Sequence, residues 1–325
     1  MTAPRIVIAE HLWDGSWRAD GALLVADGVV RPATPDEVEM AATGSTERLA
    51  GWVMPGFTDF HVHLDLVDAA GVATGALARV LDLGSNPSRE LRAGDVEVVR
   101  AGQILTAVGG YPSTRPWAAD AMFREVGPGD AEAAVGEQAT IGAAVIKIAL
   151  NSDIGPVWPD DLLADVVGVA HERNLPVIVH VEGAGEAARA ATAGVDAFAH
   201  TPFSEDLDAA LVKHLAATTT WVSTLRIHSG RDREFALANA ARFQAAGGRI
   251  LYGTDMGNGS SSGGVERDEL ELLAEAGVGD DALLTALTGG SLLPRWTATV
   301  SRAETEPASG AELTAWLTAA RATRV

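Results

Sequence analysis

The sequence predicts an α/β protein whose main body is a (β/α)8 TIM-like barrel, preceded by a small N-terminal β-unit. Two observations carry this prediction. From residue 55 onward, eight short apolar runs alternate with stretches rich in Ala, Leu and Glu. Alternating strands and helices imply parallel strands joined by crossovers. Eight such units over about 240 residues match the size of a (β/α)8 barrel.

The elements follow in order along the chain. The first residues contain the β-like runs RIVIAEHLW and GALLVADGVV, broken by Gly, Asp and Pro, so residues 1–54 are expected to form the small β-rich unit. The barrel is assigned to residues 55–295, with strands expected at 56–64, 76–84, 102–110, 143–150, 175–183, 195–201, 218–225 and 249–255. The tail, 296–325, offers a strand in RWTATVS and a helix in GAELTAWLTAARATRV. Whether this tail joins the small unit is left open.

Composition narrows the class of partner. The net charge of −20 and the pI of 4.7 disfavour nucleic acid and anionic membrane surfaces, because both attract basic patches. The absence of cysteine excludes disulfides and thiolate metal ligands. We find no signal peptide and no apolar run of about 18 residues, so a cytoplasmic protein acting on a small molecule is expected. Homo-oligomerisation is left open.

One lysine stands in an unusual place. Lys147 interrupts the apolar run GAAVIKIAL at 142–150, which is predicted to be a buried strand. The chain has only one other lysine, Lys213. Lysine is rarely buried without a partner, because burial disfavours its charged form. Lys147 is therefore a candidate for a chemical role.

Histidines and an acid gather at the C-terminal ends of the predicted strands. In FHVHL, two histidines lie two residues apart, and alternate residues of a strand share a face. In a barrel these strand ends open onto one face, where the active site lies. A single histidine there is more often a satisfied polar residue than a ligand, so the prediction rests on the combination. The candidate metal ligands are His61, His63, Lys147, His180, His200 and Asp255.

The order of these motifs resembles the amidohydrolase superfamily of metal-dependent hydrolases. PGFTDFHVH, the strand lysine, VHVE, AHT and GTD follow one another as in that family. The likeness is strongest to the imidazolonepropionase-like and prolidase-like branch, which carries a lysine on its fourth strand. The resemblance implies two divalent ions, expected to be Zn²⁺. One would bind His61, His63 and Asp255, the other His180 and His200, with Lys147 between them as a CO₂-derived carbamate.

The same resemblance implies a binuclear hydrolase that cleaves an amide-type C–N bond with a metal-activated hydroxide. The scissile bond would belong to a cyclic amide, an N-acyl compound or a dipeptide-like molecule. Asp255 would transfer the proton. The branch usually has a tyrosine after the seventh strand that polarises the carbonyl, but this chain reads STLRIHSG there. Arg226 or His228 would take that role. The candidate catalytic residues are Asp255, Lys147 and His228, and the candidates for substrate binding are Tyr111, Arg115, Arg226 and His228.

Other interpretations stay open at this point. Lys147 could form an ion pair with Glu182 instead of a carbamate. A mononuclear deaminase of the same superfamily usually has an acid three residues after the fifth-strand histidine, where this chain has Gly183. Lactone or organophosphate hydrolysis uses the same binuclear site. A non-catalytic metal-binding protein is the alternative from another class.

Overall fold

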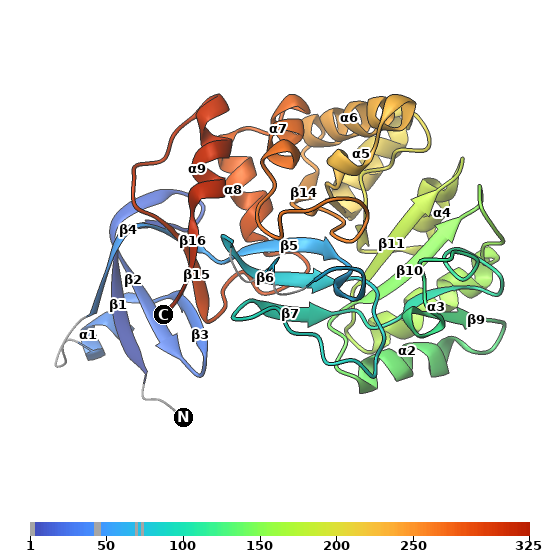
Figure 1. Cartoon of the computed structure of the whole chain (residues 1–325), viewed down its shortest axis with the longest axis horizontal. Coiled ribbons are helices and arrows are strands. Elements are labelled where there is room, and N and C mark those ends of the chain that lie inside the picture. Colours follow the sequence, from blue (N-terminus) through green and yellow to red (C-terminus); the bar gives the residue numbers. More distant parts are fainter. Residues whose placement is uncertain (1–3, 42–46, 69–70, 73–74) are drawn as a thin grey trace.

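The computed structural model describes residues 4–41, 47–68, 71–72 and 75–325, which form a small sheet beside a larger barrel (Figure 1). The small sheet has six strands in the order β16-β15-β4-β1-β2-β3. It joins the two ends of the chain. Its strands are β1 (Arg5–Trp13), β2 (Trp17–Ala26), β3 (Val29–Pro32), β4 (Glu47–Pro55), β15 (Thr299–Ala303) and β16 (Arg321–Arg324).

The barrel has eight strand positions, and every neighbouring pair is parallel. The third position is split into β7, which pairs with β6, and β8, which pairs with β10. The positions are β5 (Phe57–Val62), β6 (Leu77–Asp82), β7 (Glu97–Arg100) with β8 (Ile104–Ala107), β10 (Ile146–Asn151), β11 (Val177–Glu182), β12 (Ala197–Phe198), β13 (Thr220–Val222) and β14 (Arg249–Leu251).

The ring closes between its first and last strands. Phe60 N donates to Tyr252 O at 3.0 Å, and Val62 forms a parallel bridge with Met256. Apolar side chains fill the interior, as expected for this barrel. One core cluster takes a residue from each position: Phe60, Leu81, Ala101, Val145, Ile178, Ala197, Val222 and Leu251. The predicted barrel is confirmed.

Helices cover the barrel only after its third position. Their bounds are α2 (Ala131–Thr140), α3 (Asp160–Glu172), α4 (Glu186–Ala193), α5 (Ala209–Thr218), α6 (Gly230–Ala245), α7 (Arg267–Glu275) and α8 (Asp280–Thr288). The described residues of 63–76 and 83–96 contain no α-helix, so strict alternation of strand and helix is wrong there. Turn-forming residues such as Pro87 and Gly94 explain the second loop. An extra strand, β9 (Phe123–Val126), pairs with β8.

The tail departs from its prediction at its end. A helix forms at α9 (Leu313–Ala319), but the last residues form β16 instead of continuing that helix. β16 pairs antiparallel with β15, with Thr323 opposite Val300, so sheet hydrogen bonds replace the local helical preference. The remaining helix, α1 (Pro35–Ala41), lies beside the small sheet. Among the described helices, none has the length and apolar character to cross a membrane.

Candidate metal centre

The alternation of barrel strands brings two of the predicted ligands into the interior. Lys147 follows the interior residue Val145 by two positions, and His180 follows Ile178 by two. Side chains two apart on a strand share a face, so both point toward the barrel interior. Both are buried. Lys147 is the second residue of β10, so it lies nearer the start of its strand than the sequence pattern predicted, whereas His180 is the fourth residue of β11.

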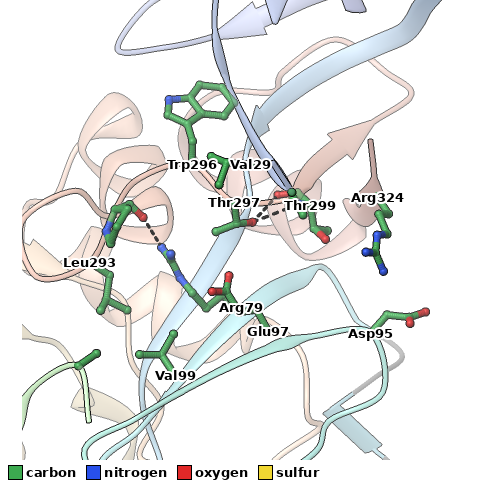
Figure 2. Close-up of a pocket in the computed structure, with 14 residues that line it drawn as sticks. Val29, Arg79, Asp95, Glu97, Val99, Leu293, Trp296, Thr297, Thr299 and Arg324 are labelled. Atoms are coloured by element: carbon green, nitrogen blue, oxygen red, sulfur yellow. Dashed lines mark hydrogen bonds between the residues drawn. The ribbon is translucent and has the colours of Figure 1, made fainter. Parts of the chain in front are cut away.

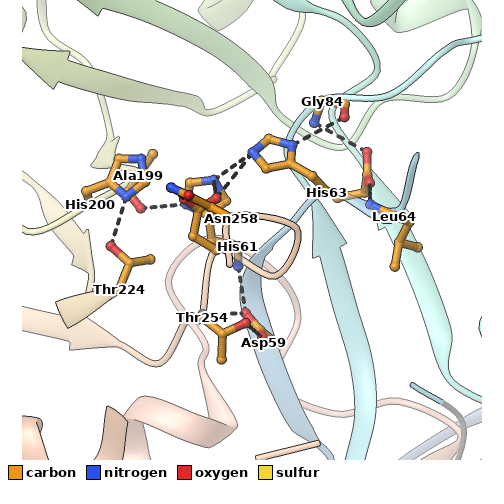
Figure 3. Close-up of polar contacts among 12 residues, drawn as sticks. Asp59, His61, His63, Leu64, Gly84, Ala199, His200, Thr224, Thr254 and Asn258 are labelled. Carbon is orange, nitrogen blue, oxygen red and sulfur yellow. Dashed lines mark hydrogen bonds and ion pairs between the residues drawn. The ribbon is translucent and has the colours of Figure 1, made fainter. Parts of the chain in front are cut away.

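Three donor atoms meet at the closure of the ring (Figure 3). Nε2 of His61 lies 3.2 Å from Nε2 of His63 and 3.1 Å from Oδ1 of Asp255. Nε2 of His63 lies 3.4 Å from the same oxygen. Ligands about 2.0–2.1 Å from a tetrahedral Zn²⁺ are about 3.3 Å apart. The spacing of the three atoms therefore fits a shared divalent ion.

The protonation of this cluster also suits a metal. Nδ1 of His61 donates to Ala199 O at 2.7 Å, which leaves Nε2 with its lone pair directed into the cluster. Burial, and then the charge of Lys147, lowers the pKa of His61 well below its ordinary value. Burial opposes ionisation of Asp255, but the surrounding imidazoles hold the pKa of Asp255 well below its usual range. Neutral imidazoles and an ionised carboxylate are the forms that bind metals.

Two more histidines continue the site. The ring centroids of His61 and His200 are 4.6 Å apart, and those of His200 and His180 are 5.0 Å apart. Ligand atoms of His61, His200 and Asp255 all lie within 4.8 Å of one another. Nδ1 of His200 bonds Thr224 Oγ1 at 2.8 Å, so its Nε2 remains for a ligand. Nε2 of His180 lies 3.3 Å from a carboxylate oxygen of Glu182.

Lys147 has no ion-pair partner in the part of the chain that the structure describes. The expected alternative partner, Glu182, accepts instead from Asn151 Nδ2 at 2.6 Å and faces His180. Burial lowers the pKa of Lys147 to about 7, although the charge of Asp255 opposes this. A substantial fraction of the amine is therefore neutral near pH 7, the form that reacts with CO₂.

A cavity of about 370 Å³ opens next to His63. Its other walls are Leu66, Tyr111, Trp117, Gly257 and Asn258. The ring of Tyr111 stacks on His180 with centroids 5.0 Å apart. Burial raises the pKa of the Tyr111 phenol, so it stays a neutral hydrogen-bond donor.

The remaining substrate-binding candidates differ in availability. Nε2 of His228 is buried without a hydrogen-bond partner among the described residues, and its ring stacks on Phe203 at 4.1 Å. Burial lowers the pKa of His228 to about 4. Arg115 is partly buried, and its guanidinium makes no ion pair within the described ranges. Arg226 is engaged elsewhere, because its Nη2 donates to Ser260 O at 2.7 Å and its Nε faces Asp268 at 3.4 Å.

Sequence reasoning missed several structural features that support the candidate ligands. Thr224 and Asp255 both have positive φ, at 46° and 52°. This conformation is strained for a β-branched residue, and such strain concentrates at functional sites. Glu269 is buried and accepts from the backbone N–H groups of Leu225 and Arg226 at 3.0 and 2.8 Å, so it fixes the loop that carries His228.

Asp59 supports the first strand in the same way. Asp59 precedes His61 by two residues on β5, so it shares the face of the two histidines. Its Oδ1 accepts from the backbone N–H groups of His61 at 3.0 Å and Thr254 at 3.1 Å, and its Oδ2 accepts from Thr254 Oγ1 at 2.6 Å. It therefore ties the first strand to the last. The sequence signal was a buried acid on the ligand face, but its partners were too distant in sequence to identify.

The sequence is similar to a small number of known proteins. No protein-family model matches the chain. An uncharacterised protein of Mycobacterium tuberculosis is 27% identical over 284 residues, which cover 74% of this chain and 73% of that protein. A protein of Mycobacterium bovis matches to the same extent.

Several solved structures share the fold. Ochratoxinase from A. niger superposes with a TM-score of 0.76 at 18% identity, covering 98% of this chain and 94% of that one. A protein described as an amidohydrolase gives 0.70 at 17% identity, covering 98% and 96%. Phenylurea hydrolase B gives 0.71 at 14% identity, covering 97% and 94%. These similarities confirm the fold that the resemblance to the amidohydrolase superfamily implied.

Proposed function

We propose that this protein is a metal-dependent amidohydrolase that cleaves an amide-type C–N bond in a small molecule. The observation that carries the proposal is the cluster of His61, His63 and Asp255, whose donor atoms lie 3.1–3.4 Å apart at the C-terminal end of the barrel. The fold shared with ochratoxinase and phenylurea hydrolase B supports hydrolysis of a C–N bond, which their names suggest. The substrate would bind in the 370 Å³ cavity next to the cluster.

A second ion would be held by His180 and His200, with a carbamate of Lys147 between the two ions. Support comes from the burial of Lys147, from the absence of an acidic partner in the described residues, and from a pKa of about 7. When bound, divalent ions supply an acidified water and polarise the substrate carbonyl. Zn²⁺ suits the imidazole and carboxylate donors.

The chain's own residues would handle protons and position the substrate. The Asp255 carboxylate lies at the shared corner of the donor cluster, so it is placed to accept a proton from the attacking water and pass it to the leaving nitrogen. His228 would donate from Nε2 to the developing oxyanion, because this nitrogen is buried and has no partner in the described structure. Arg226 is less suited to that role, because its guanidinium is already bound to Ser260 O.

The loop between β8 and β9 would recognise the substrate. Tyr111 and Trp117 wall the cavity and give an aromatic surface. The partly buried Arg115 has no ion-pair partner among described residues, and its guanidinium is suited to a carboxylate. The expected substrates are therefore N-acyl amino acids or dipeptides rather than uncharged amides.

The test is a hydrolysis screen on metal-reconstituted protein, with N-acyl amino acids, dipeptides, lactones, phosphotriesters and aminopurines. We expect release of amine from the first two groups, and metal content approaching two ions per chain. His228→Ala should lower kcat about 10²–10³-fold with unchanged metal content. His214→Ala, on the exposed surface of α5, is the matched control. Ammonia release from aminopurines with a single bound ion would instead identify a deaminase.

A further inference from the structure

A second and larger cavity lies away from the metal centre, between the barrel and the small sheet (Figure 2). Its volume of about 470 Å³ is in the range of small-molecule sites. It is bounded by the barrel strands β6 and β7, by the turn between β2 and β3, and by the segment that leads into β15. None of the predicted metal or substrate residues lines it.

Arg79 of β6 lines this cavity and is the unusual residue in it. Only 2% of Arg79 is exposed, and no carboxylate within the described residues lies close enough to form an ion pair. Its Nε donates to Thr58 Oγ1 at 3.2 Å and its Nη2 to Pro294 O at 2.8 Å. A guanidinium has five N–H donors, so three remain for an acceptor. A buried cation without an anion is costly, so a carboxylate placed there would gain a strong partner.

A carboxylate lies on the strand next to Arg79. Glu97 of β7 is the register partner of Arg79 on β6, so the two side chains belong to one neighbouring pair. They nevertheless form no ion pair within 4.0 Å. Asp95 and Arg324 also line the cavity, and among the described residues neither has an ion-pair partner. Two cations and two anions thus line one space without direct ion-pair contacts among the described residues, although the charge of Glu97 raises the pKa of Arg79 against the effect of burial.

The remaining walls are largely apolar. Val99 and Leu293 come from the barrel side, whereas Val29 and Trp296 come from the side of the small sheet. A ligand for this cavity therefore needs an anionic group, a cationic group close to it and a short apolar body.

We propose that this cavity is a binding site for a free α-amino acid with an aliphatic side chain. Its carboxylate binds the Arg79 guanidinium, its ammonium binds Glu97, and its side chain packs against Val99, Leu293 and Trp296. Thr58 and Arg79 lie on the strands that continue to His61 and Asp82, so a bound amino acid would contact the base of the metal site's own strands. This proposal does not depend on the proposed hydrolytic activity.

The test is calorimetric titration of the full-length protein with three matched probes. L-leucine carries both charges, 4-methylpentanoate lacks only the ammonium, and 3-methylbutylamine lacks only the carboxylate. L-leucine should bind at least tenfold more tightly than either analogue. Arg79→Lys should weaken L-leucine and 4-methylpentanoate about tenfold, because lysine cannot form the bidentate contact. Glu97→Gln should weaken L-leucine several-fold and leave 4-methylpentanoate unchanged.

Glu39→Gln, which removes the same charge from a residue outside the cavity, is the control and should bind like the wild type. Glu97 is exposed, so its variant carries the test even where Arg79→Lys fails to fold. Equal affinity for all three probes overturns the proposal. So does binding that survives both substitutions and disappears on chelation, because the ligand would then be at the metal centre.

Discussion

Replacing Lys147 with methionine should stabilise the metal-free protein and at the same time remove its capacity for two ions. Methionine has nearly the same volume and shape as the lysine stem, so packing is largely kept. What changes is the amine, which is 2% exposed and has no ion-pair partner in the described structure. The free energy of unfolding should therefore report the cost of burying that amine.

The magnitude follows from the pKa of Lys147, which burial lowers from 10.5 to about 7 in the folded protein. This difference corresponds to ~5 kcal/mol. The unfolded chain binds more protons than the folded chain between these two values, so stability rises with pH across that window. The penalty is fully present below pH 7 and absent above pH 10.5. At pH 7 the variant should gain a few kcal/mol.

The assay is urea unfolding of chelator-treated protein at intervals from pH 6 to pH 11. Subtracting the wild-type curve from the Lys147→Met curve removes other titrating groups, and the difference should decline between pH 7 and pH 10.5. Lys213→Met, at the exposed second lysine on α5, should give a flat difference near zero. A variant less stable than the wild type at pH 7 would refute the reasoning, because it would mean that the ammonium is stabilised by a structural partner.

The carbamate makes a separate prediction for the metal-loaded protein. Lys147→Ala should lose metal and activity together, and short carboxylic acids added to the solution should restore part of both by filling the bridging position. Lys147→Arg should not respond, since its guanidinium stays protonated and cannot bind a cation. If carboxylic acids restore nothing, or if the arginine variant keeps its metal, the bridge is wrong.

Three further substitutions test the supports of the site. Thr224→Ala removes the hydroxyl that holds an imidazole of the site, and should weaken metal affinity about 10–100-fold in chelator competition, whereas Thr224→Ser should not. Glu269→Ala leaves two buried backbone N–H groups without an acceptor and should lower the unfolding free energy by about 2–4 kcal/mol, with Glu269→Gln less affected; equal unfolding midpoints would contradict this. Gly253→Ala would place a Cβ 3.2 Å from Cβ of His61 and 2.3 Å from a valine methyl, so it should cost ~1–3 kcal/mol and weaken metal binding, whereas Gly168→Ala, in open space on α3, should be tolerated.

The sequence predicted the parts of the structure that depend on local periodicity. Strands β10 and β11 were predicted from their apolar runs, and the shared face of His61 and His63 was predicted from their spacing of two residues. The barrel polarity then gathered the strand-end residues at one face. For the same reason, the cluster of His61, His63 and Asp255 was anticipated although its members are about 190 residues apart.

Features that depend on non-local pairing were not predicted. Nothing in GQILTAVGG indicates that the third strand is split, because the split arises from different partners on its two sides. The final residues had a helical composition, but pairing with β15 decided their structure. The role of Glu269 on α7 could not be predicted, since the two backbone N–H groups that its carboxylate accepts from lie more than 40 residues away. The engagement of Arg226 by Ser260 was invisible for the same reason.

Closure of the barrel has a consequence for how the protein reaches its native state. His61 and His63 emerge early in synthesis, whereas Asp255 emerges about 190 residues later and meets them only when β14 docks beside β5. Contacts of such long range form late, because the chain entropy of a large loop must be lost first.

The last two strands of the small sheet, β15 and β16, are synthesised after Asp255. β15 and β16 pair beside β4 only after all the barrel strands have been made, so the small sheet is completed later than the barrel strands are synthesised. The three-donor cluster is likewise absent from any partly folded species in which the ring is open. A metal ion would therefore bind at this cluster only in chains whose barrel has closed. Refolding in the presence of Zn²⁺ should stabilise the native state without stabilising its precursors.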